Sequence, residues 1–262
     1  MKLVSLNTWG ATQGQILFDF VQQHKADTDI FCFQEVFSVP AGEQRKESRK
    51  ARVHLFEELS GILPEFAGYF ESTSVNHDIL GPVDFDLSFG LATFVKKDLE
   101  IGTYQVFPTF GNKTDIVLED FSNIPRAAQQ ITIRTGHGEC HVVNFHGIPM
   151  PGNKLDTPDR LEQSRLLNGI LRQFVGPKIM CGDFNLELET ESIKMLGKEM
   201  RNLIRDYKIE NTRNEISWAM YPGSDQHYAD YTFVSPNVKV KKFEVPYNLV
   251  SDHLPMILTF QI

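Results

Sequence analysis

Short apolar runs that end in an acid, an amide or an imidazole recur along the whole chain. They include LVSLN at 3–7, DIFCFQE at 29–35, VVNFH at 142–146, IMCGDFN at 179–185, YADYTFVS at 228–235 and LVSDHLP at 249–255. One such polar residue is usually a turn or a cap. Repeated placement at strand ends instead indicates a site, because a sheet fixes the backbone there and the following loops leave room for a ligand.

The hydrophobic periodicity predicts alternating strands and helices. We expect strands over 3–8, 29–35, 69–74, 91–96, 128–134, 139–145, 178–181, 230–234, 238–245 and 254–261. We expect helices over 13–24, 43–62, 157–174 and 189–200, with Thr157 as the N-cap of the third. The segments 76–89 and 109–126 are predicted to be long loops, which in compact domains are usually functional. No repeat or linker interrupts the pattern, so we expect a single domain over 1–262.

The net charge of -8 and the pI of about 5.5 argue against a protein that coats duplex nucleic acid. They are compatible with an enzyme whose acidic residues surround a metal. The three cysteines lie in or beside apolar runs without zinc-ligand spacing, which favours buried free thiols and a reducing compartment. No apolar stretch approaches membrane-spanning length. We therefore expect a cytoplasmic monomer without a membrane anchor.

The polar residues at these run ends have the identity and order of a known family. The set comprises Asn7, Gln34-Glu35, His146, GDFN at 182–185, Asp230-Tyr231 and Ser251-Asp252-His253. It resembles the endonuclease/exonuclease/phosphatase family over residues 3–260, and GDFN together with the C-terminal SDH is its most specific part. The resemblance implies an α+β fold, namely a four-layer α/β/β/α sandwich of two packed, mainly antiparallel sheets.

Three of these residues are candidates to hold a divalent cation. Glu35 supplies a hard oxygen ligand that suits Mg²⁺ or Mn²⁺. Asn7 can help to hold the metal or its water through its amide oxygen. By resemblance, Asp252 is either a further ligand or a group that orients the attacking water. Trp9 stands where some nuclease relatives carry a second acid, which favours one metal over two.

The remaining residues are candidates for catalysis. Asp183 is expected to accept a proton from the attacking water, and Asn185 to donate to a phosphate oxygen. Asp230 is expected to orient the ring of His253 and to stabilise its cationic form, which donates to the phosphate as charge develops. His146 is expected to do the same from the opposite side. The mechanism is an in-line attack by water, without a covalent intermediate.

Basic residues provide candidate contacts for substrate phosphates. Arg45, Arg49 and Arg52 would share one face of the predicted helix over 43–62. This stripe indicates either a track for phosphates or a solvated face with interspersed glutamates. Arg126, Lys154 and Arg160 are further candidates near motif ends.

The leading hypothesis is a nuclease-like phosphodiesterase that acts on a nucleic acid or nucleotide. The alternative is a phosphomonoesterase or a lipid (sphingomyelin-type) phosphodiesterase, because one scaffold serves unrelated substrates. A catalytically inactive binding module would require a broken motif, and the core motif positions are intact.

Overall fold

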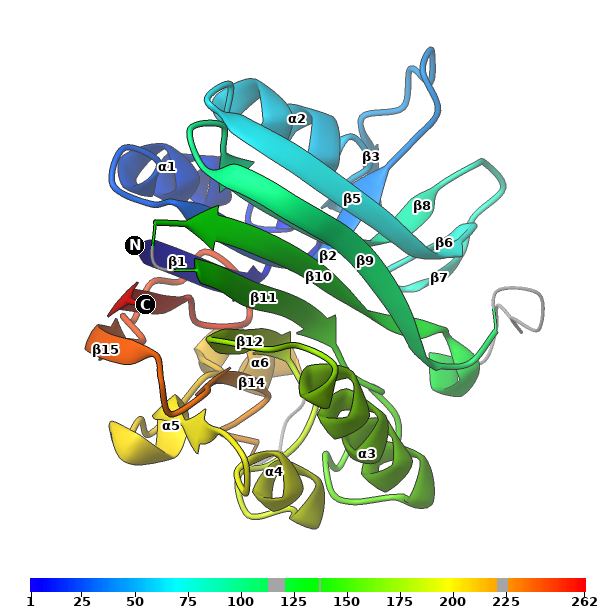
Figure 1. The fold of residues 1–262 in the computed structure, drawn as a ribbon. Helices are drawn as coiled ribbons and strands as arrows, with labels where there is room; N and C mark the ends of the chain where they lie inside the picture. The colour runs from blue at the N-terminus through cyan, green and yellow to red at the C-terminus, as the bar shows by residue number, and fades with distance from the viewer. Residues whose placement is uncertain (113–120, 137, 221–225) are drawn as a thin grey trace.

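Two six-stranded sheets pack face to face, and helices cover their outer faces (Figure 1). The computed structural model describes residues 1–112, 121–136, 138–220 and 226–262. Most strand pairs are antiparallel, and the pairs β1–β2 and β11–β12 are parallel. The predicted four-layer α/β/β/α sandwich is therefore confirmed.

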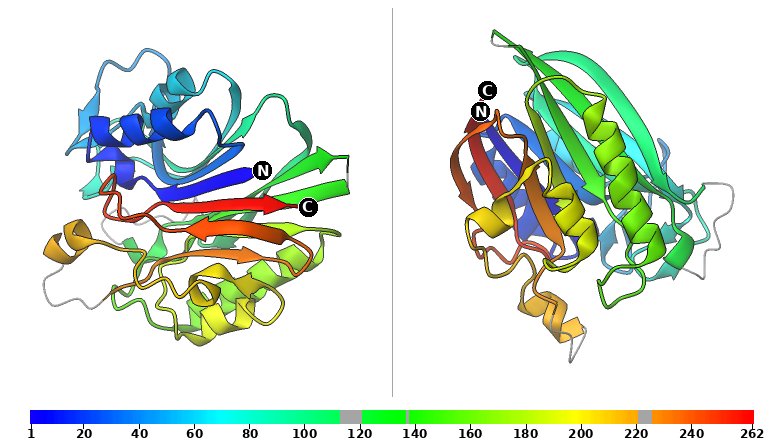
Figure 2. Two further views of the ribbon diagram at one scale, coloured as in Figure 1. Left: turned by 90° about the vertical axis from the view of Figure 1, so that its left-hand side faces the viewer. Right: turned by 60° about the horizontal axis from the view of Figure 1, so that its bottom comes forward.

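The first sheet has the strand order β15-β16-β1-β2-β8-β5. Its strands are β1 (Lys2–Asn7), β2 (Ile30–Ser38), β5 (Phe66–Val75), β8 (Ser88–Lys96), β15 (Lys239–Glu244) and β16 (Met256–Gln261). Helices α1 (Gln15–His24) and α2 (Leu55–Ile62) pack on it through apolar side chains such as Leu17 and Leu59, which meet Phe31 and Phe33. Because β1 pairs with β16, the two termini lie side by side (Figure 2).

The second sheet has the order β13-β14-β12-β11-β10-β9. Its strands are β9 (Glu100–Phe110), β10 (Arg126–Thr135), β11 (Gly138–His146), β12 (Lys178–Asp183), β13 (Arg201–Asn202) and β14 (Asp230–Val234). Helices α3 (Pro158–Arg172) and α4 (Glu191–Leu196) pack against it, and Thr157 caps α3 as expected, accepting from the backbone N–H of Arg160 at 3.2 Å.

Short elements complete the described part of the chain. They are η1 (Trp9–Ala11), β3 (Glu47–Ser48), β4 (Ala51–Arg52), β6 (His77–Asp78), β7 (Gly81–Pro82), η2 (Phe121–Asn123), α5 (Leu203–Asp206) and α6 (Glu215–Met220). Within the described ranges, every helix is too short or too polar to cross a bilayer.

Strand direction explains why the polar motifs meet at one edge. β1, β11 and β12 end there, at Asn7, His146 and Asp183. The prediction that Asp230 and the Asp252-His253 pair also end strands is wrong: Asp230 begins β14, and the pair precedes β16. Since β14 is antiparallel to β12 and β16 to β1, their starts lie at the same edge as the other strands' ends.

The predicted helix over 43–62 is wrong in its first half. Residues 47–52 form the hairpin β3–β4, whose turn residues Arg49 and Lys50 have left-handed φ values of 46° and 80°. The helix over 189–200 shortens to α4, and β9 was not predicted. The predicted loop 76–89 contains the β6–β7 hairpin. Residues 113–120 of the other predicted loop lie outside the described residues.

The three cysteines are free and buried, as predicted. Burial raises the pKa of the Cys140 thiol to about 12. Cys32 and Cys181 lie in the core that includes residues of both sheets. The Cys140 thiol therefore remains protonated at neutral pH in the folded protein.

Gly182 lets β12 approach β11, and we predict that Gly182→Ala destabilises the protein. Gly182 has a φ of 138°, and a Cβ there would lie 2.0 Å from the carbonyl oxygen of Phe145. The expected loss in unfolding free energy is about 1–3 kcal/mol or more. Gly169→Ala in α3 is the control, because nothing lies within 4 Å of its Cβ, and it should stabilise the helix by about 0.5–1 kcal/mol. If chemical denaturation gave the same change in unfolding free energy for Gly182→Ala and Gly169→Ala, the proposed role of Gly182 would be refuted.

Candidate active site

Glu35 reaches the site through an irregularity in β2. The register between β2 and β8 shifts between Phe33 and Val36, and Glu35 has a left-handed φ of 56°. A bulge of this kind redirects a side chain that regular pleating would point elsewhere. Burial, followed by the charges of nearby carboxylates such as Asp252, raises the pKa of Glu35. Glu35 therefore lies in a buried acidic environment that favours a compensating cation.

Asn7 joins the carboxylates of two strands. Its Nδ2 donates to Glu35 Oε1 at 3.0 Å and to Asp183 Oδ2 at 2.9 Å. Its Oδ1 accepts from the backbone N–H of Trp9 at 3.0 Å. The amide oxygen of Asn7, which the sequence predicts to face a metal, therefore accepts a hydrogen bond within the turn. The amide nitrogen holds the two carboxylates in place.

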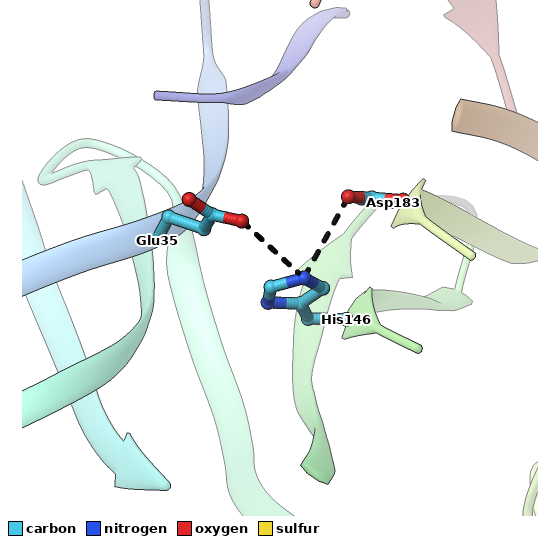
Figure 3. A group of neighbouring side chains, drawn as sticks. All are labelled: Glu35, His146 and Asp183. Carbon is cyan, nitrogen blue, oxygen red and sulfur yellow. Dashed lines mark ion pairs between the residues drawn. The ribbon is translucent and has the colours of Figure 1, made fainter. Parts of the chain in front are cut away.

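His146 lies between the two carboxylates, as Figure 3 shows. Its Nε2 is 3.7 Å from Glu35 Oε1 and 3.6 Å from Asp183 Oδ2. Burial, and then the charge of Arg126, hold the pKa of His146 well below its ordinary value. The ring is therefore neutral at neutral pH, which differs from the cationic donor expected from the sequence and suits a metal ligand.

Asp183 remains ionised inside the protein. Burial opposes its charge, but His253, His146, Lys154 and Arg213 outweigh it and lower the pKa of Asp183 to about 2. Its Oδ1 accepts from the backbone N–H of Asn185 at 2.8 Å. The GDFN segment therefore holds a charged carboxylate in a fixed orientation.

Asp230 and His253 form the predicted pair. His253 Nδ1 donates to Asp230 Oδ2 at 2.7 Å, and Nε2 faces Asp183 Oδ2 at 3.8 Å. Burial disfavours protonation of the ring, but the surrounding carboxylates, Asp230 foremost, raise the pKa of His253 to about 9. The ring is therefore a cationic donor at neutral pH.

Arg213 is a site residue that the sequence reasoning missed. Its guanidinium is buried, lies 3.1 Å from both Asp252 Oδ2 and His253 Nε2, and donates to Ser217 Oγ at 2.6 and 2.8 Å. Asp252, a predicted metal ligand, is thus engaged by a fixed cation. Arg213 reaches the site because its backbone forms an isolated bridge with that of His253, a long-range pairing that no local motif indicates.

Two of the predicted phosphate-contact residues line the same pocket. Arg126 Nε donates to the Gly147 carbonyl at 3.0 Å, while its buried Nη1 has no partner among the described residues. Lys154 Nζ donates to the Pro149 carbonyl at 2.9 Å and to Asn185 Oδ1. Burial lowers the pKa of Lys154 to about 7. Both side chains can present positive charge to an anion in the pocket.

The other predicted basic contacts have different partners. Arg45 stacks 3.9 Å from the Phe85 ring centroid and pairs with Asp84, and Arg49 pairs with Asp78 at 3.1 Å. They share no helix face, because the helix expected there is a hairpin. Arg160 is buried, and its guanidinium donates to backbone carbonyls within residues 148–155, so it shapes the segment that carries Lys154.

The site opens into a pocket of about 510 Å³. Its lining includes charged residues and apolar residues such as Trp9, Ile79, Ile124 and Met150. In the part of the chain that the structure describes, two groups of side chains could hold a cation, each with ligand atoms within 4.8 Å of one another: Glu35, His146 and Asp183, and Asp183, Asp230 and His253. The first fits better, because His253 is already protonated and paired.

Comparison with known proteins agrees with this geometry. Residues 4–253 match the Endonuclease/Exonuclease/phosphatase family, whereas a search of curated proteins gave no significant match. Solved structures with the same fold include an endonuclease/exonuclease/phosphatase from Bacteroides vulgatus (19% identity, TM-score 0.69, covering 100% of this chain and 98% of that chain). Another is the mannosyl-6-phosphatase of Bacteroides thetaiotaomicron (18% identity, TM-score 0.71, covering 100% of this chain and 100% of that chain). The human Nocturnin catalytic domain with a bound sulfate anion is a third (18% identity, TM-score 0.66, covering 100% of this chain and 93% of that chain).

At these identities the structural likeness establishes the fold, and the sequence match establishes the family. Its members are hydrolytic phosphoesterases and are typically dependent on a divalent metal. The chain belongs to the Endonuclease/Exonuclease/phosphatase family and is a phosphoesterase.

Proposed function

We propose that this enzyme is a nuclease-like phosphodiesterase that hydrolyses an ester of a nucleic acid or nucleotide by direct attack of water. The observation that carries the proposal is the convergence of Glu35, Asp183 and the Asp230–His253 pair at one pocket, where Arg126 Nη1 has no hydrogen-bond partner among the described residues. Carboxylates that orient water and cations that bind phosphate are the parts that phosphoryl transfer requires.

The donor set fits Mg²⁺ or Mn²⁺. Glu35 and Asp183 offer hard carboxylate oxygens, and His146 offers a neutral nitrogen. Burial, followed by the charge of Asp252, raises the pKa of Glu35, and a bound cation would offset both effects by stabilising the ionised carboxylate. A divalent cation bound there would neutralise the phosphate and stabilise the developing charge on the leaving oxygen.

The protein's own side chains account for the remaining steps. Asp183 orients the attacking water and accepts its proton as the new P–O bond forms. Arg213 Nη1 and His253 Nε2 lie 3.1 Å apart at the pocket, and both groups can donate to a phosphate oxygen bound beside them. Arg126 supplies a further donor through Nη1, and Asn185 Nδ2 can donate to another oxygen.

Phosphomonoester hydrolysis is a second candidate. The same fold occurs in a protein described as a mannosyl-6-phosphatase, and the Arg126, Arg213 and His253 donors suit the additional terminal oxygen of a monoester. A panel of DNA, RNA, nucleotide, sugar phosphate, inositol phosphate and sphingomyelin substrates distinguishes these activities. Diester turnover supports the first proposal, and turnover confined to monoesters supports the second.

We predict that Asp183→Asn and His253→Ala lower turnover by about 10²–10⁴-fold, because they remove the proton acceptor and the cationic donor. Chelation of divalent cations should abolish the activity. Asp19→Asn is the matched control, since Asp19 is exposed on α1 and remote in sequence from the motifs. Steady-state rates with the best substrate of the panel provide the measurement. Full activity of both site variants would refute these roles.

We also predict that Asp230→Asn lowers the pKa of His253. In the unmodified protein this pKa is raised from 6.5 to about 9, and burial raises the pKa of Asp230 to about 6, so the ion pair is intact between about pH 6 and 9 and its contribution to stability is lost as the pH rises through 9. The activity that depends on the cationic ring should decline over the same alkaline range. NMR titration of the ring measures the shift directly. An unmodified protein whose His253 titrates below 6.5 would contradict the prediction.

A further inference from the structure

Trp9 differs from the other aromatic residue that lines the pocket. Phe89 is buried and contacts the rings of Phe37, His77 and His146. Trp9 is only partly buried, and its indole contacts no other ring within the described ranges. A large flat side chain at a pocket wall, without an internal ring partner, is free to pack against a ligand.

The backbone holds Trp9 in a fixed position. Trp9, Gly10 and Ala11 have consecutive left-handed φ values of 47°, 58° and 57°. Such a conformation is unfavourable for Trp9 and Ala11, and it persists only where the surroundings determine it. The Asn7 side chain accepts from the Trp9 N–H at 3.0 Å, and a Cβ on Gly10 would lie 2.7 Å from the Phe37 ring. The turn is therefore fixed by its hydrogen bond to Asn7, whose amide joins the two carboxylates, and by the close packing of Gly10 against Phe37 in the core.

The rest of the pocket divides by chemistry. Arg126 and Arg213 supply positively charged guanidinium groups to its lining, whereas Trp9, Ile79, Ile124 and Met150 supply apolar surface. The volume of about 510 Å³ accommodates a small ligand rather than a rigid duplex. A ligand that matches both parts carries a phosphate and, close to it, a flat apolar ring.

We propose that Trp9 is the stacking platform for a nucleobase of the substrate, and that this contact selects nucleotide esters over phosphate esters that have no aromatic ring. The inference rests on the proposed phosphodiesterase function. A base stacks on an aromatic side chain with a strength that corresponds to about 5- to 140-fold in affinity. Stacking does not depend on base identity, so we expect little sequence preference.

A binding experiment tests the contact without requiring turnover. The chain has two tryptophans, so Trp218→Phe leaves Trp9 as the only tryptophan fluorophore. Titration in Mg²⁺ with AMP and with ribose 5-phosphate separates the base from the sugar phosphate, and released phosphate is monitored in parallel. We expect AMP to change the Trp9 emission and to bind at least about 5-fold more tightly. Unchanged emission with AMP, or equal affinities for both ligands, would overturn the proposal.

Variant kinetics test the contribution to specificity. Trp9→Ala should raise KM for a dinucleotide by about 5- to 140-fold, while KM for the abasic dinucleotide stays unchanged and Trp9→Phe restores most of the loss. Leu166→Ala removes an exposed apolar side chain from α3 and is the control. An equal loss with both substrates would refute stacking. If no diester is hydrolysed, the phosphodiesterase proposal fails, and the fluorescence titration still decides the role of Trp9.

Discussion

The site depends on a hydrogen bond buried between the two sheets. Gln34 Nε2 donates to Asn144 Oδ1 at 2.7 Å, and Asn144 Nδ2 donates back to the Phe33 carbonyl at 3.1 Å. Gln34 immediately precedes Glu35, and Asn144 lies two residues before His146. Because a buried amide without its partner is destabilising by about 1–3 kcal/mol, this pairing favours one register of the sheets. The same register sets Glu35 opposite His146.

Charge compensation is the second requirement of the site. Glu35, Asp183, Asp230 and Asp252 are brought together at one edge of the two sheets, and like charges in a buried space are unfavourable without cations. The chain supplies His253 beside Asp230 and Arg213 beside Asp252. Among the side chains of the described residues, Asn7 alone donates a hydrogen bond to Glu35. Asp230 and Asp252 thus each have a basic partner within 3.1 Å, whereas Glu35 is held by the neutral amide of Asn7.

Strong local patterns made much of the fold and part of the site predictable from the sequence. Apolar runs located most central strands, and the motif order identified the family and its layers. Where local pattern and tertiary context differ, the prediction failed: the basic stretch with Arg45, Arg49 and Arg52 has helical spacing, yet a left-handed turn at Arg49 makes it a hairpin. The half-exposed β9 has a weak pattern. Arg213 enters the site only through its long-range bridge to His253.

The central claim is that Glu35 anchors a divalent cation at this edge of the sheets. Calorimetric titration of the metal-free protein with Mn²⁺ tests it most directly, using Glu35→Gln and, as a control, Glu162→Gln on the exposed face of α3. The account predicts that the unmodified protein and Glu162→Gln bind Mn²⁺ alike, and that Glu35→Gln binds it at least about 10-fold more weakly while it remains folded. Equal Mn²⁺ affinity of all three proteins would contradict the account.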